Sequence, residues 1–79
     1  MSDFVPLASF VDRAEAIIAR GVLETNGINV LAPDLYTLAA DPGLVFAIGG
    51  YRVLVQKSQL AEAQALLRDI AAESAKSSD

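Results

Sequence analysis

The stretch "AIGGYRVLV", residues 47–55, decides the fold because two adjacent glycines separate apolar runs that favour β-structure. A glycine loop that binds phosphate is followed by a helix N-terminus, so that backbone N–H groups converge on the anion. Here "YRVLV" follows Gly49 and Gly50 and predicts a strand instead. We therefore interpret the pair as a hairpin turn, or as a bulge that bends one long strand over residues 44–56.

Upstream of this stretch, "FVPLASF" (4–10) predicts a first strand. Pro6 has no N–H for a ladder hydrogen bond, which places this strand at an edge of the sheet. A helix then begins either at Ser9, with Asp12 completing a capping box, or at Asp12 itself, with Glu15 in the first turn.

The first helix is expected to run to about Asn26, where Gly27 supplies a left-handed residue that ends it. Its polar stripe is narrow, and most of its other residues are apolar; the stripe consists of Arg13, Arg20 and Glu24. Two interpretations stay open. The helix is either well covered by the core, or one of its flanks contacts another subunit.

The remaining segments complete the predicted order of elements. "INVLAP" (28–33) predicts a second strand, and an Asp-Pro-Gly turn lies in the 33–43 loop. A second helix is expected over 57–73, with Ser58 as its cap, followed by a polar, disordered tail at 74–79. The apolar face of this helix consists of Leu60, Ala63, Leu66, Leu67 and Ile70.

This order predicts one α+β domain over residues 1–73 with a split βαβ arrangement. We expect a truncated ferredoxin-like fold (β-α-β-β-α), with two helices on one face of a small antiparallel sheet. A full ferredoxin-like fold would have a fourth strand after the second helix. Without that strand the edge of the first strand is open, which invites pairing with another chain.

Composition also favours self-association. The chain has 79 residues and is 53% hydrophobic, yet a chain of this size buries only about 60% of its unfolded surface. A homo-oligomer, with a dimer favoured, would cover the surplus apolar surface. The net charge is −4 and the basic residues are scattered, so we expect no nucleic-acid partner.

The chain contains no cysteine and no histidine. Their absence removes disulfides, zinc sites with sulfur or imidazole ligands, and nucleophiles activated by histidine. We therefore expect no enzyme activity and no cofactor. The start of the chain lacks the pattern of a signal peptide, and no apolar run has membrane-spanning length. The expectation is a cytoplasmic protein without membrane contact.

The 33–43 loop is the leading candidate for a contact site, because it is longer than a hairpin needs and contains Leu35, Tyr36 and Leu38. We expect these apolar residues to contact an unidentified protein partner. Asp34 and Asp41 flank the loop and could share a cation, but with no third ligand we favour two solvated turn residues.

Two residues of the third strand extend this candidate site. Tyr51 and Tyr36 could line a pocket, and Arg52 has no acidic neighbour in the local sequence. Arg52 is then either a solvated side chain or an anion contact. The alternative function is a small-molecule sensor, with a ligand bound between subunits near the loop.

Three short patterns resemble a known family. "LETNGINV" (23–30) and "YRVLVQKSQLAEAQALL" (51–67) are similar to a small bacterial family of putative prokaryotic signal-transducing proteins. The matching positions are Leu23-Glu24-x-x-Gly27-Ile28, Val53-Leu54-Val55 and Ala63-x-x-Leu66-Leu67.

The resemblance implies a truncated ferredoxin-like fold related to the PII type, and a regulatory or protein-interaction role without catalysis. It implies no catalytic or ligand-binding residues. In PII proteins the loop between the second and third strands meets the partner. By this analogy of fold, the resemblance directs attention to the 33–43 loop.

Overall fold

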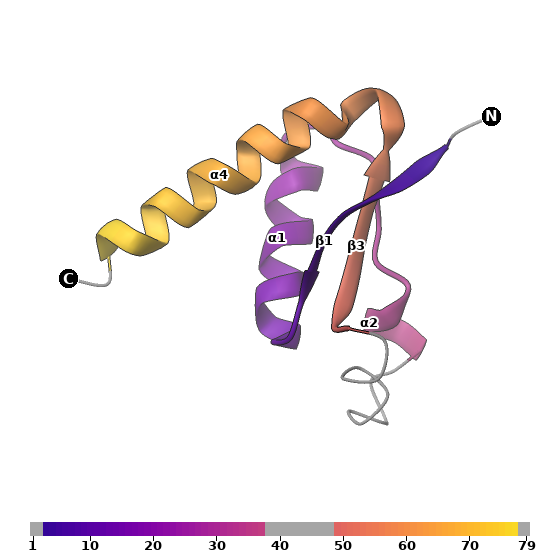
Figure 1. The fold of residues 1–79 in the computed structure, drawn as a ribbon, viewed down its shortest axis with the longest axis horizontal. Helices are drawn as coiled ribbons and strands as arrows, with labels where there is room; N and C mark the ends of the chain where they lie inside the picture. The colour runs from indigo at the N-terminus through magenta and orange to yellow at the C-terminus, as the bar shows by residue number, and fades with distance from the viewer. Residues whose placement is uncertain (1–2, 38–48, 78–79) are drawn as a thin grey trace.

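The computed structural model describes residues 3–37 and 49–77 (Figure 1). Its elements follow the predicted order, and they form the small antiparallel sheet with helices that a truncated ferredoxin-like fold requires. In chain order they are β1 (Phe4–Phe10), α1 (Arg13–Thr25), β2 (Val30–Leu31), α2 (Asp34–Thr37), β3 (Tyr51–Gln56), the 3₁₀ turn η1 (Lys57–Gln59) and α4 (Leu60–Ser77).

The three strands form one sheet in the order β1-β3-β2. Both outer strands pair antiparallel with β3, so β1 and β2 are parallel to each other on either side of it. This is the predicted split βαβ arrangement. β1 lies at the edge, as Pro6 indicated, and its register shifts between Pro6 and Ala8. A bulge at this point lets an edge strand twist away from regular pairing.

Helix α1 begins and ends at local signals. The carboxylate of Asp12 accepts a hydrogen bond from the Ala14 N–H at 2.9 Å, so Asp12 is the N-cap, the second of the two starts considered. At the other end Gly27 has a φ of 83°. The N–H of Ile28 donates to the carbonyl of Leu23 at 3.0 Å, which closes the last turn.

Strand β2 contains only Val30 and Leu31, fewer residues than the six predicted. The reason is that the preceding backbone donors are used elsewhere. Ile28 closes α1, and the N–H of Asn29 donates to the side chain of Gln59 at 2.9 Å. These two residues therefore belong to the turn rather than to the sheet.

The 33–43 loop was expected to lack regular structure, but its first residues form a helical turn, α2. The N–H of Leu35 donates to the carbonyl of Ala32 at 3.2 Å. Residues 38–48, which include Leu38 and Asp41, lie outside the described residues. Of the stretch 44–56, which was predicted as a hairpin or one bent strand, the structure describes residues 49–56, which contain β3.

The second long helix differs from its prediction at both ends. Ser58 is not its cap, because η1 precedes the helix and follows Gln56 without a side-chain capping bond. The N–H of Lys57 instead donates to the carbonyl of Asp3 at 2.8 Å. At the other end α4 continues to Ser77, so the first four residues of the expected tail are helical.

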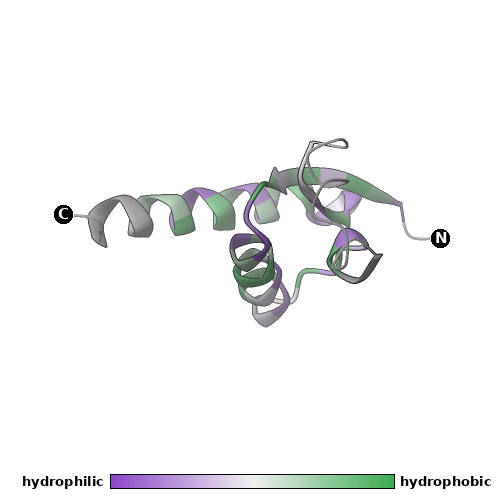
Figure 2. Cartoon of the chain, turned by 90° about the horizontal axis from the view of Figure 1, so that it is seen from below, coloured by the Kyte–Doolittle hydropathy of each residue, from purple (hydrophilic) through white to green (hydrophobic). Residues whose placement is uncertain are grey.

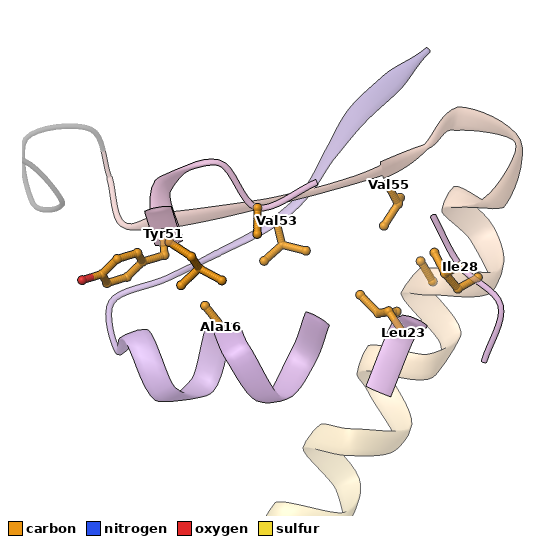
Figure 3. Packing of buried hydrophobic residues seen from close by; sticks show 9 residues of the cluster. Ala16, Leu23, Ile28, Tyr51, Val53 and Val55 are labelled. Atoms are coloured by element: carbon orange, nitrogen blue, oxygen red, sulfur yellow. The ribbon is translucent and has the colours of Figure 1, made fainter. Parts of the chain in front are cut away.

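The core lies between the sheet and α1. Tyr51, Val53 and Val55 point from β3 towards α1 (Figure 3), and both valines are fully buried. Ala16 on α1 and Ala63 on α4 are also fully buried, and their small side chains let both helices approach the strands closely. Nothing in the described helices combines the length and apolar character that a membrane crossing requires.

Candidate functional site: an apolar row on the open face of the sheet

Alternate residues of β3 face opposite sides of the sheet. Tyr51, Val53 and Val55 are buried on the side that α1 covers, so Arg52, Leu54 and Gln56 face the other side. We call that side the open face. It is the part of the sheet that the core does not use.

The strand register places two further apolar residues beside Leu54. Pro6 of β1 and Leu31 of β2 both lie directly opposite Leu54. Directly opposed residues of antiparallel strands share a face. A line of apolar side chains therefore crosses all three strands and consists of Pro6, Leu54 and Leu31. We call it the apolar row.

The exposure of this row is unusual for an antiparallel sheet. Leu31 is 47% exposed, Pro6 is exposed and Leu54 is half-buried. The solvent side of such a sheet normally carries polar side chains. The apolar centre of the open face is therefore a candidate contact surface.

Along β3, an ion pair lies beside the row, at the end of the strand that contains Arg52. The Nε and Nη2 groups of Arg52 donate to the two carboxylate oxygens of Asp34, each at 2.9 Å. The backbone N–H of Arg52 donates to the same carboxylate at 2.9 Å. Asp34 is only 3% exposed. This two-pronged contact fixes the start of α2 against β3.

The pair also sets the charge state of Asp34. Hydrogen bonds from the Arg52 side chain hold the pKa of the Asp34 carboxyl below its usual value, although burial acts in the opposite direction. The same contact raises the pKa of the Arg52 guanidinium. Both groups are therefore ionised at neutral pH. Arg52 has an acidic partner after all, 18 residues away in the sequence.

Carboxamides lie on the other side of the row, at the opposite end of β3. The side-chain amide of Asn29 donates to the Gln56 side chain at 2.7 Å. Gln59 in turn donates to the carbonyl of Gly27 at 3.0 Å. A groove of about 590 Å³ adjoins this end, with Phe4 among its lining residues.

The open face thus has an apolar centre and a polar rim held by hydrogen bonds within the chain. Protein–protein interfaces have the same anatomy, with an apolar centre surrounded by polar groups. A preformed rim reduces the conformational entropy that a partner must remove on binding.

The predicted contact residues have three different locations. Leu35 and Tyr51 lie in the core, so core packing explains the apolar character that suggested contact. Asp34 and Arg52 come together at the rim. The backbone of Tyr36 lies in α2, and Leu38 lies outside the described residues. Within 3–37 and 49–77, no group of three or more His, Cys, Asp or Glu residues is placed to hold a metal ion.

The two glycines take the conformation that a turn requires. Gly49 and Gly50 have φ values of 90° and 110° and lead directly into β3. A strand and not a helix N-terminus follows them, as predicted for a turn and unlike a phosphate-binding loop; the residues that would show a hairpin or a bulge, 44–48, lie outside the described residues.

The apolar row was not foreseen, because its residues come from three separate strands. Only the register brings Pro6, Leu54 and Leu31 together, and no local pattern encodes that register. A second apolar surface was partly foreseen. Ile18 on α1 and Val11, which precedes the cap residue Asp12, are 58% and 66% exposed.

The fold and this surface together define a small α+β domain of truncated ferredoxin-like type. A family model described as "Putative prokaryotic signal transducing protein" matches residues 4–71. The chain belongs to that family. No curated protein and no solved structure matches the chain.

Proposed function

We propose that the chain is a non-enzymatic regulatory module that binds another protein through the open face of its sheet. The apolar row of Pro6, Leu54 and Leu31 is the observation that carries this proposal. The family description, which refers to signal transduction, supports a regulatory role. We place this role in the cytoplasm, and it needs no cofactor.

The chemistry of the surface describes the partner. An apolar row with a guanidinium on one side and carboxamides on the other suits a protein segment with apolar side chains and polar flanks. Arg52 is half-exposed, but its Nε and Nη2 groups are already bonded to Asp34. We expect Arg52 to shape the rim, and the partner's affinity to come mainly from the apolar centre.

A small-molecule sensor has less support. A site for a small ligand encloses most of the ligand surface, whereas the row lies across an open sheet face. Tyr51, which a sensor was expected to use, is buried in the core. The proposed contact by the 33–43 loop remains compatible with the main proposal, because Asp34 anchors the start of that loop at Arg52, beside the row.

Affinity capture from cells that naturally express the chain tests the proposal. The bait variant Leu31→Glu places a charge in the apolar row, and Ile18→Glu is the matched control on α1. Both positions are exposed, so both variants should fold. We expect Leu31→Glu to lose partners that the wild type and Ile18→Glu retain. Equal partner lists for all three baits would contradict the proposal.

A further inference from the structure

A second apolar surface lies on the other side of the sheet, between the two long helices. Figures 1 and 2 show α4 running away from the body of the molecule while α1 stays beside the sheet. The space between them is a groove of about 500 Å³. We call it the helix groove, and it is lined by Ala8, Phe10, Glu15, Ile18, Ala19, Leu67, Ile70 and Ala71.

The two halves of α4 have different surroundings. In the first half Ala63 is fully buried, and Leu60 and Leu66 pack against the core. In the second half Leu67, Ile70 and Ala71 line the helix groove. Their spacing of three and four residues puts them on one stripe of the helix. This stripe is apolar, although the core does not cover it.

The surface area of the chain is large for its mass. A compact monomer of 8.3 kDa is expected to expose about 4,600 Å², whereas this chain exposes 5162 Å². A helix that leaves the body adds surface of this kind. Covering it requires a partner that presents an elongated apolar surface of similar size.

We infer that α4 of a second copy of this chain fills the helix groove, in a two-fold arrangement in which each copy gives one helix and receives one. The stripe of Leu67, Ile70 and Ala71 forms one wall of the groove in its own copy. The same residues can also enter the groove of the other copy. Such self-complementarity is what an isologous dimer interface requires.

Charge supports the second copy as occupant. Glu15 is an acidic residue in the apolar lining of the groove, and Arg68 is exposed on α4 next to Leu67. Among the described residues neither side chain has an intramolecular partner. An inserted α4 brings its Arg68 to the groove that contains Glu15 of the other copy, so the two charges complement each other across the interface.

An interface of standard size would cover a modest share of the surface of this chain. A standard interface buries about 800 Å² on each partner, roughly a sixth of the 5162 Å² of this chain. Pairing through the helices also leaves both open faces free. Self-association and the proposed binding of another protein therefore use separate surfaces and can fail separately.

Sedimentation velocity across a dilution series tests the inference on the full chain. We expect a reversible dimer in the wild type. Ile70→Glu and Ile18→Glu should each raise the dimer dissociation constant about tenfold or more, because each introduces a charge into an apolar contact. Leu31→Glu, on the open face, should leave the constant unchanged. Circular dichroism on each variant shows whether it is folded, and Ile18 is exposed enough to keep this test valid if Ile70→Glu is unstable.

A charge exchange sharpens the test. Glu15→Lys and Arg68→Glu should each weaken the dimer, and the double variant should recover most of the loss. A wild type that stays monomeric at every concentration would overturn the inference, as would a dimer disrupted by Leu31→Glu but not by Ile18→Glu or Ile70→Glu. A monomer that still captures a partner through Leu31 would overturn the dimer and leave the proposed function intact.

Discussion

The two sides of β3 show how differently one strand can use its residues. Val53 and Val55 are fully buried against α1, and Tyr51 is nearly so. On the opposite side, Arg52 and Gln56 form hydrogen bonds within the chain, and only Leu54 between them has an apolar side chain. The buried side explains why the chain folds. The open side departs from the usual polar pattern at the apolar row, and this departure is the basis of the proposed binding surface.

The largest expected effect on stability comes from truncating a side chain on the buried side of β3, and the comparison is the same truncation on the open side. Val53→Ala should lower the free energy of unfolding by about 2–3 kcal/mol, because it removes two fully buried methyl groups and leaves a cavity. Leu54→Ala should cost about 1 kcal/mol, since half-buried Leu54 packs against fewer neighbours. Urea unfolding of both variants measures the difference. Equal losses would mean that Leu54 belongs to the core.

The turn that leads into β3 offers a comparison between neighbouring glycines. Both have positive φ, so Gly49→Ala should cost about 1 kcal/mol. Gly50→Ala should cost about 2 kcal/mol or more, because its new Cβ would lie 2.8 Å from the Phe10 carbonyl oxygen, whereas no atom lies within 4 Å at Gly49. Thermal unfolding, with and without ATP, measures both variants. Equal costs, or a wild type that ATP stabilises, would contradict this account.

A smaller effect is expected at the rim of the open face. The pKa of Asp34 is lower in the folded chain than in the unfolded chain. The stabilisation from its pairing with Arg52 is therefore complete above the unfolded pKa, and it is lost as the pH falls through the lower folded value. Asp34→Asn should cost about 1–2 kcal/mol at neutral pH, since Asp34 is buried while solvent screens the half-exposed Arg52.

Unfolding measured from neutral to acidic pH checks the direction of this effect. The gap between the wild type and Asp34→Asn should narrow as the pH falls. Asp12→Asn provides the control, because it removes a carboxylate at the cap of α1, far from Arg52 in the sequence. A gap that is independent of pH would show that the charge of Asp34 does not matter.

Local chemistry made much of this fold predictable. Pro6 indicated an edge strand, Gly27 the end of α1, and the glycine pair a bend before β3; each of these depends on the residue's own backbone. The order of elements followed from periodicity. The cap of α4 and the length of β2 were mispredicted, because the donors of Ile28, Asn29 and Lys57 bond to groups distant in sequence or in another element.

The candidate site was harder to predict because it depends on strand register. Asp34 and Arg52 were each singled out, but nothing in the local sequence shows that they pair. Leu35 was expected at a partner surface, since an apolar residue in a loop can either contact a partner or pack into the core. Composition alone does not separate these possibilities. The apolar row required the register of both strand pairs.

Photocrosslinking at two positions tests the central claim most directly. A photoreactive amino acid placed at position 31 samples the open face, and one at position 18 samples the helix groove. In cells that naturally express the chain, we predict crosslinks from position 31 to a different protein and from position 18 to a second copy. Crosslinks from position 31 only to a second copy, or to no protein, would contradict the open face as the binding surface.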